Sequence, residues 1–115
     1  MDLNRKRVLV VDDHPGMRHS LRRALEVCGI KGPHAVTNAH EAVARLRNMR
    51  YDIVLADFDL GPGPDGQQLL EHCRAEALLA PGAVFVMVTA ERGYDKVMCA
   101  AELQPDDYLV KGFTR

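Results

Sequence analysis

Two hydrophobic patterns alternate along the chain: short continuous apolar runs, and stretches in which apolar residues recur every three or four positions. Near-continuous apolar runs, rich in valine, leucine and isoleucine, are typical of strands buried on both faces of a parallel sheet. Such runs lie at residues 7–12, 52–57, 83–88 and 107–110, and a weaker one lies at 34–37. Between them, apolar residues recur every three or four positions, as Met17, Leu21, Leu25 and Cys28 do, and this spacing predicts helices.

Local sequence signals predict where the helices begin and end. Pro15 suits the first turn of a helix, and Gly29 suits the position just beyond a last turn. Two capping boxes, in which a polar residue is followed three positions later by Glu or Gln, predict the starts of two more helices. The boxes are formed by Asn38 with Glu41 and by Asp65 with Gln68. A further helix is predicted at about 95–103, and the glycines and prolines of 61–64 predict a loop.

The alternation of strands and helices predicts an α/β fold with a doubly wound, parallel, five-stranded sheet of the flavodoxin-like kind. At 115 residues the chain has room for one domain. In such a sheet the functional site lies beyond the carboxyl ends of the strands. The residues that follow the strands are therefore the candidates for the site.

Composition narrows the classes of function. Hydrophobic residues make up 47% and charged residues 27% of the chain, as in ordinary globular proteins. The formal net charge of −1 argues against direct nucleic-acid binding by this domain. No apolar run is long enough to span a membrane or to act as a secretory signal, so a cytoplasmic location is predicted. The three cysteines, Cys28, Cys73 and Cys99, form no CxxC pair and are interpreted as reduced thiols on helix faces.

Basic residues are concentrated in the first half of the chain. Residues 1–50 hold ten Lys and Arg against five Asp and Glu, whereas residues 51–115 hold five against eleven. Two basic groups are prominent, the run Arg5–Lys6–Arg7 and the helix-spaced set Arg18, Arg22 and Arg23. Each group fits a partner surface and also fits an ordinary solvated face, and both interpretations stay open at this point.

Polar side chains follow four of the five predicted strands. Asp12 and Asp13 follow the first strand, Asp57 ends the third, Thr89 follows the fourth and Lys111 follows the fifth. Crowded carboxylates repel one another unless a cation joins them, and oxygen ligands with open water positions favour Mg²⁺. A hydroxyl and an ammonium group can bind phosphoryl oxygens, and a carboxylate can itself accept a phosphoryl group. The strand ends therefore predict a site for phosphoryl transfer.

Five segments carry a resemblance to a known family. They are VLVVDDH at 8–14, DIVLAD at 52–57, DG at 65–66, VMVTA at 86–90 and DYLVK at 107–111. Together they resemble the receiver domain of two-component response regulators and are similar to the single-domain chemotaxis regulators. The resemblance covers nearly the whole chain.

The resemblance implies a phosphoacceptor and a metal site. Asp57 would accept a phosphoryl group from a phosphohistidine on a sensor histidine kinase or a phosphotransfer protein. Mg²⁺ would be held by Asp12, Asp13 and Asp57 and by the backbone carbonyl of Asp59. The domain would be a signalling switch that phosphorylates and dephosphorylates itself, and not an enzyme that acts on a separate substrate.

The resemblance also implies roles for residues at the fourth and fifth strands. Thr89 would donate a hydrogen bond to the phosphoryl group, Lys111 would pair with it, and the small Ala90 would leave the pocket open. Thr89 and Tyr108 would form the switch, because the aromatic ring would turn into space that Thr89 vacates on phosphorylation.

The chain departs from the family pattern at three places. The loop after Asp57 has one extra residue, with Gly61 where the family has proline and with Asp65–Gly66 one position later than usual. Gly112 replaces the proline that usually follows the lysine, so a trans bond or local strain is expected there. The sequence ends one helix short of the family pattern, so we expect a receiver domain over residues 1–115 truncated before its fifth helix. Apolar surface left open by that helix predicts self-association, for example as a homodimer, or marginal stability.

Two alternatives compete with a phosphorylated switch. The stretch from Ile53 to Asp59 also matches the DxD start of haloacid-dehalogenase-type phosphatases, in which Asp57 would be the nucleophile and Asp59 the general acid. The other alternative is a receiver-like interaction module that is never phosphorylated.

Overall fold

The computed structural model describes residues 5–90 and 107–111, with side chains for residues 5–88. The elements are β1 (Val8–Val11), α1 (Pro15–Val27), β2 (His34–Val36), α2 (Ala39–Asn48), β3 (Ile53–Asp57), α3 (Gly66–Ala75), β4 (Val84–Ala90) and β5 (Asp107–Lys111). The helix predicted at 95–103 and the bond before Gly112 lie outside the described residues. No helix in the described ranges is long and apolar enough to cross a membrane.

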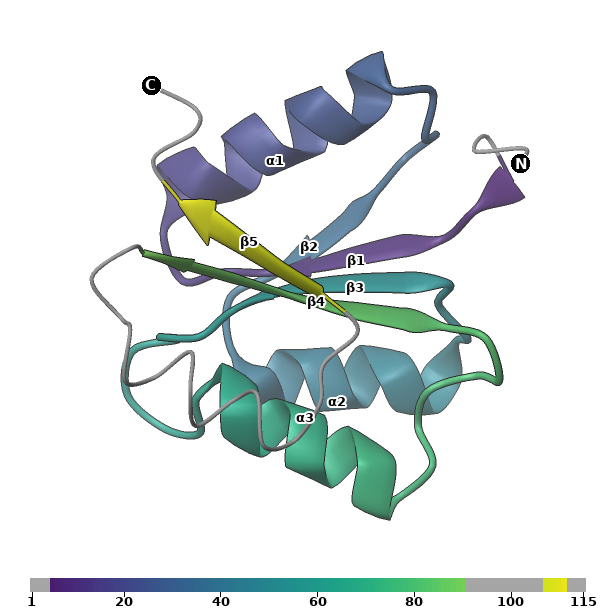
Figure 1. The fold of residues 1–115 in the computed structure, drawn as a ribbon, viewed down its shortest axis with the longest axis vertical. Coiled ribbons are helices and arrows are strands. Elements are labelled where there is room, and N and C mark those ends of the chain that lie inside the picture. Colours follow the sequence, from purple (N-terminus) through teal and green to yellow (C-terminus); the bar gives the residue numbers. More distant parts are fainter. Residues whose placement is uncertain (1–4, 91–106, 112–115) are drawn as a thin grey trace.

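The five strands form one parallel sheet in the order β2-β1-β3-β4-β5. Helix α1 covers one face of the sheet, and α2 and α3 cover the other (Figure 1). This arrangement confirms the predicted doubly wound, flavodoxin-like α/β fold. The order reverses at β1 and β3, which pair with each other, so the carboxyl ends of these two strands mark the switch point of the sheet.

Alternate residues of β1 enter two separate cores. Leu9 and Val11 pack under α2 and α3, whereas Val8 and Val10 pack under α1. The central strands have continuous apolar sequences because their side chains are buried on both faces of the sheet. Each fully buried Val or Leu contributes about 1.5–3 kcal/mol relative to an exposed one.

The predicted helix starts are largely confirmed. The Asp65 capping box is complete, because Gln68 N donates to Asp65 Oδ1 at 2.8 Å and Asp65 N donates to Gln68 Oε1 at 2.9 Å. Asn38 caps α2 by accepting from Glu41 N at 2.9 Å. The second bond of the predicted box, from Asn38 N to the Glu41 carboxylate, is not formed, so that part of the prediction is wrong. The Glu41 carboxylate instead accepts from the backbone N and hydroxyl of Thr37. These bonds lower the pKa of Glu41.

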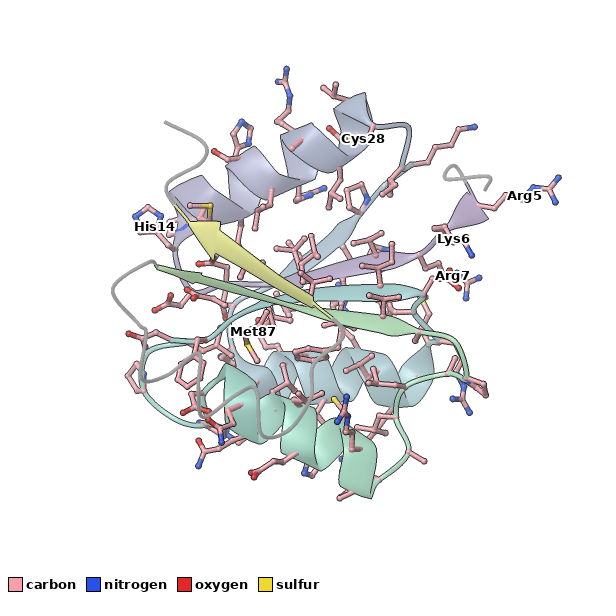
Figure 2. All side chains as sticks on the ribbon, viewed as in Figure 1. Arg5, Lys6, Arg7, His14, Cys28 and Met87 are labelled. Carbon is pink, nitrogen blue, oxygen red and sulfur yellow. The ribbon has the colours of Figure 1, made fainter. Side chains whose placement is uncertain are left out.

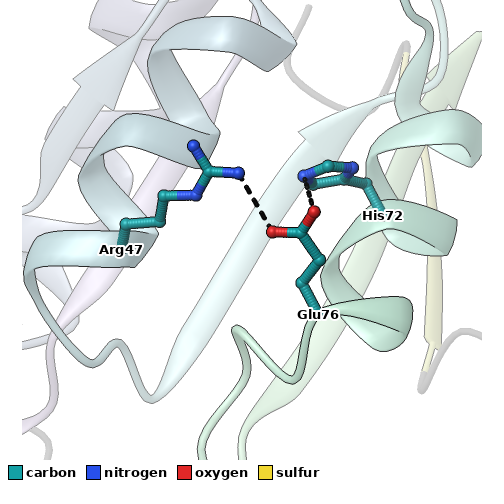
Figure 3. Close-up of polar contacts among 3 residues, drawn as sticks. All are labelled: Arg47, His72 and Glu76. Atoms are coloured by element: carbon teal, nitrogen blue, oxygen red, sulfur yellow. Dashed lines mark hydrogen bonds and ion pairs between the residues drawn. The ribbon is translucent and has the colours of Figure 1, made fainter.

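Helices α2 and α3 are joined at their surface by one carboxylate (Figure 3). Glu76, just beyond α3, lies 3.0 Å from Arg47 Nη2 and 3.3 Å from His72 Nε2. The hydrogen bond from Arg47 is the main reason that the pKa of Glu76 is lowered. An exposed bridge of this kind adds little stability, so the packing of the two helices rests on their apolar faces.

The cysteine prediction is confirmed at one described position and wrong at the other. Cys73 lies on the core face of α3, where burial raises the pKa of its thiol to about 12 and keeps it protonated. Cys28 is exposed and caps the end of α1, so it does not lie on a helix face. Gly29 follows it with φ of 101°, as predicted for the residue that ends the helix.

Candidate functional site

Three carboxylates meet at the carboxyl ends of β1 and β3. Oxygens of Asp12, Asp13 and Asp57 all lie within 4.8 Å of one another. The parallel register places Val11 opposite Ala56, so the residues that follow in each strand emerge side by side. Asp12 is 0% exposed and Asp57 is 7% exposed, whereas Asp13 is exposed. The group is therefore a buried pair of carboxylates with a third one at its open side.

The turn after β1 holds Asp12 from several directions. Its Oδ1 accepts from the backbone N of His14 at 2.9 Å, and its backbone carbonyl accepts from Arg18 Nη1 at 2.9 Å. Its own backbone N donates to Val36 O at 3.1 Å. His14 is also the N-cap of α1, because its Nδ1 accepts from Met17 N at 3.3 Å. The start of α1 thus fixes the geometry of the first carboxylate.

The residues after β3 turn back on the Asp57 carboxylate. Asp57 Oδ1 accepts from the backbone N of Asp59 at 3.3 Å, and Asp59 Oδ1 accepts from Gly61 N at 3.1 Å. The Asp59 side chain is exposed, and within the described residues it is outside the cluster of three carboxylates. Its predicted metal ligand is the backbone carbonyl, and that ligand stays a prediction.

Two glycines let the loop after β3 pass close to the carboxylates. Gly61 has φ of 76°, and a Cβ there would lie 2.9 Å from Asp13 Oδ2. A Cβ at Gly66 would collide with the backbone O of Asp57 and would lie 3.0 Å from Phe58 Cα. Gly66 N also donates to Phe58 O at 2.7 Å. The loop with one extra residue therefore still brings the start of α3 against the end of β3.

The remaining predicted residues are placed by backbone register. In the pairing of β3 with β4, Asp57 lies opposite Val88, so Thr89 is the next residue beyond it. In the pairing of β4 with β5, Ala90 lies opposite Lys111. The backbones of all three residues therefore lie at the same carboxyl edge as the carboxylates. Their side chains lie outside the described part of the chain.

Tyr108, a member of the predicted switch pair, lies near the start of its strand and not at its carboxyl end. It is the second residue of β5 and lies opposite Met87, whereas Thr89 lies opposite Val110. The two strands are neighbours, as predicted. Thr89 and Tyr108 are thus offset by two residues along the strand pair.

Sequence reasoning missed the roles of His14 and Arg18 at this edge. The helical spacing groups Arg18 with Arg22 and Arg23, as a partner surface or a solvated face. The structure separates them, because Arg18 is half-buried and bonded to Asp12, whereas Arg22 and Arg23 are exposed. The partner of Arg18 is a backbone carbonyl, so no second side chain in the sequence indicates this hydrogen bond. The one available signal is the position of Arg18 in the first turn of α1, close to Asp12 along the chain.

The donor set of this site fits a hard divalent cation. The clustered ligands are all carboxylate oxygens, which Mg²⁺ prefers, and the exposed side at Asp13 leaves positions for water. Without a cation the three negative charges would repel one another. The site can therefore concentrate positive charge beside Asp57, as phosphoryl transfer requires.

Comparisons with known proteins agree with this geometry. The family model described as response regulator receiver domain matches residues 8–115. The chain is 34% identical over 113 residues to the DNA-binding response regulator MtrA of Mycolicibacterium smegmatis, covering 98% of this chain and 47% of MtrA. It therefore spans about half the length of that relative. It is 31% identical over 108 residues to the chemotaxis protein CheY-3 of Vibrio cholerae, covering 94% and 82% of the two chains.

Solved structures show the same similarity in three dimensions. The response regulator TrrA of Thermotoga maritima, solved in complex with Mg²⁺ and BeF, has a TM-score of 0.79 and 30% identity, over 94% of this chain and 88% of that one. CheY4 of Vibrio cholerae has a TM-score of 0.81 at 23% identity, over 94% of this chain and 88% of that one, which supports the fold alone. On its fold, its carboxylate cluster and these matches, the chain belongs to the response regulator receiver domain family.

Proposed function

We propose that this chain is a phosphorylation-dependent signalling switch in which Asp57 is the phosphoacceptor and Mg²⁺ is the cofactor. The observation that carries the proposal is the cluster of Asp12, Asp13 and Asp57 within 4.8 Å at the switch point of the sheet. Response regulator receiver domains exchange phosphoryl groups with histidine kinases or phosphotransfer proteins, and one of these is the proposed donor.

The chemistry assigned to Asp57 is a nucleophilic displacement. A carboxylate oxygen forms a bond to the phosphorus of a phosphohistidine as the phosphorus–nitrogen bond breaks, and the imidazole leaves with the electron pair and takes up a proton. The Asp59 amide holds Asp57 Oδ1 at 3.3 Å, which orients the carboxylate before the donor arrives. Bound Mg²⁺ would supply positive charge for the carboxylates and the phosphoryl oxygens.

The ligands and phosphoryl contacts follow from the resemblance and from the strand register. Asp12, Asp13 and Asp57, with the backbone carbonyl of Asp59, are the proposed metal ligands. The proposed phosphoryl contacts are Thr89 and Lys111, with Ala90 leaving the space open, and the proposed switch pair is Thr89 and Tyr108. A receiver domain spanning 1–115, a cytoplasmic location and a homodimer all stay predictions.

The alternatives predict different products from one experiment. The protein is mixed with Mg²⁺ and acetyl phosphate and examined by intact mass spectrometry. We expect a mass increase of one phosphoryl group in the wild type and in Asp59→Asn, but none in Asp57→Asn. Turnover of a phosphomonoester that depends on Asp59 would favour the phosphatase. No adduct in the wild type would favour the inert module and would overturn the proposal.

A further inference from the structure

Basic side chains gather at the amino edge of the sheet, opposite the carboxylates. Strands β1, β2 and β3 all begin at this edge, because they are parallel. The segments that lead into them, 5–7, 31–33 and 49–52, hold five cationic residues and one acidic residue. Figure 2 shows Arg5, Lys6 and Arg7 at the end of β1 that lies farthest from His14.

The acidic residue at this edge is engaged with the backbone. Asp52 Oδ2 accepts from Arg7 N at 2.8 Å, and Asp52 N donates to Arg7 O at 2.8 Å. These two bonds join the starts of β1 and β3. The Asp52 carboxylate is therefore bonded to the backbone at the start of β1. The side chains of Arg7, Lys31 and Arg50 are exposed.

A cavity of about 250 Å³ opens among these basic residues. Its polar lining comes from Arg7, Lys31, His34 and Tyr51, and its apolar lining from Val8 and Met49. None of the described residues that line the cavity carries a carboxylate. Its volume lies just below the usual 300–1,000 Å³ of pockets for drug-sized molecules, so it suits a smaller ligand.

A part-buried hydrogen bond between two side chains lies at one wall of this cavity. Tyr51 is 1% exposed, and its hydroxyl lies 2.6 Å from His34 Nδ1. The two rings also meet edge to face, with centroids 5.6 Å apart. His34 is half-buried, and its orientation is set by these two contacts, while Nε2 is the remaining polar atom of its ring.

We propose that this cavity binds the phosphate group of a small, soluble organic phosphate. The guanidinium of Arg7 and the ammonium of Lys31 match a dianion in charge, and the planar guanidinium fork of Arg can donate two parallel hydrogen bonds to a pair of phosphate oxygens. The fixed imidazole of His34 adds a third polar contact, and Val8 and Met49 provide a surface for a short carbon chain. Strand β1, with 4 residues, separates this site from the carboxylates by about 13 Å, at about 3.3 Å per residue. The inference therefore goes beyond the proposed phosphoacceptor function.

The test uses the full chain carrying Asp57→Asn, in buffer without divalent ions, so that neither phosphorylation nor metal binding at the carboxyl edge contributes to the signal. Inorganic phosphate and glycerol 3-phosphate are titrated at constant ionic strength while backbone amide resonances are followed. We expect saturable shifts at Lys31, Gly32 and His34, with glycerol 3-phosphate binding several-fold more tightly. Adding Arg7→Gln with Lys31→Gln should weaken binding at least tenfold.

The matched control removes the same charge from another surface. Arg22→Gln with Arg23→Gln lowers the net charge by the same amount on α1 and should change the affinity less than twofold. His34→Gln is a second test that leaves the charged pair in place, and it should weaken binding several-fold. Equal shifts from chloride, equal weakening in the two double variants, or binding only to vesicles that contain phosphatidic acid would overturn the proposal.

Discussion

The two edges of the sheet are built by the same parallel strands but carry opposite charge. At the carboxyl edge, Asp12, Asp13 and Asp57 bring three carboxylates within 4.8 Å. At the amino edge, the segments that lead into β1, β2 and β3 bring cationic residues around a cavity lined by Arg7 and Lys31. The net charge of −1 does not reveal this separation, because the negative charge of one edge and the positive charge of the other nearly cancel.

The edges also differ in how their polar groups are held. At the carboxyl edge Asp12 and Asp57 are oriented by backbone amides of their own loops, at His14 and Asp59. At the amino edge the key contact joins two side chains, Tyr51 and His34, from segments on either side of β1. Backbone-held groups depend on the path of the loop, whereas the side-chain pair depends on the identity of each residue. Substitutions should therefore act differently at the two edges.

The largest effect is expected at Gly66, where the loop meets the acceptor strand. In Gly66→Ala the new Cβ must displace the backbone O of Asp57 or the Cα of Phe58, which are rigid. We expect a loss of about 3 kcal/mol, at the upper end of the usual cost of overpacking, together with slower phosphorylation. Chemical denaturation and the rate of adduct formation measure the two effects.

Gly63→Ala is the control for that substitution. Gly63 has φ of 97°, and a Cβ there meets no atom of the described residues within 4 Å. The backbone strain should cost only about 1–2 kcal/mol and should leave phosphorylation unchanged. Equal slowing in both variants would show that the contact with Asp57 is not the cause.

The next effect concerns Asp13, the exposed member of the acidic cluster. Asp13→Asn should lower Mg²⁺ affinity about tenfold, or ~1.4 kcal/mol, because a charged ligand is lost. Without divalent ions the same variant should be more stable than the wild type by about 1 kcal/mol, since one repelling charge is gone. Thermal melts with and without Mg²⁺ test both signs. Asp65→Asn is not a suitable control, because Asp65 caps α3. Glu71→Gln is the control, because it removes one exposed charge that is not part of the cluster.

A smaller effect is expected at the amino edge from Tyr51→Phe. The variant keeps the buried ring and removes one hydrogen bond to His34, which should cost about 1 kcal/mol. Mg²⁺ affinity and the rate of phosphorylation should not change, because the substitution lies at the other end of the strands. A change in either property would show that the two edges are coupled.

The smallest effect on stability is expected away from both edges, at the ion pair between Arg47 and Glu76. Arg47 lowers the pKa of Glu76, so the ionised carboxylate is favoured in the folded state. Its contribution is present above the ordinary pKa of Glu and is lost as the pH falls through the lowered pKa. Glu76→Gln should therefore melt slightly below the wild type at pH 7, and the difference should vanish in acid.

The carboxyl edge could be predicted from the sequence because each of its features is local or follows from topology. Apolar runs predict the strands, and parallel strands gather the residues that follow them, such as Asp12 and Asp57, at one edge. The Asp65 capping box is equally local, since both of its bonds span three residues. The loop path near Gly61 could not be predicted, because it depends on the space beside Asp13.

The amino edge could not be predicted in the same way. His34 and Tyr51 are 17 residues apart and come from segments that flank β1, so no periodic pattern joins them. The sequence shows the run Arg5–Lys6–Arg7 directly. Its position relative to other cationic residues depends on the fold, because those residues lie in the segments before β2 and β3. Arg18 was misread for a similar reason, because its partner is a backbone carbonyl.

The most direct test of the central claim is the position of the phosphoryl group. The protein is phosphorylated with acetyl phosphate and Mg²⁺, reduced with borohydride to convert an aspartyl phosphate into homoserine, and mapped by peptide mass spectrometry. The account predicts homoserine at position 57 alone, and none in a sample prepared without Mg²⁺. Homoserine at position 12, 13 or 59 in place of 57, or none at any position, would contradict it.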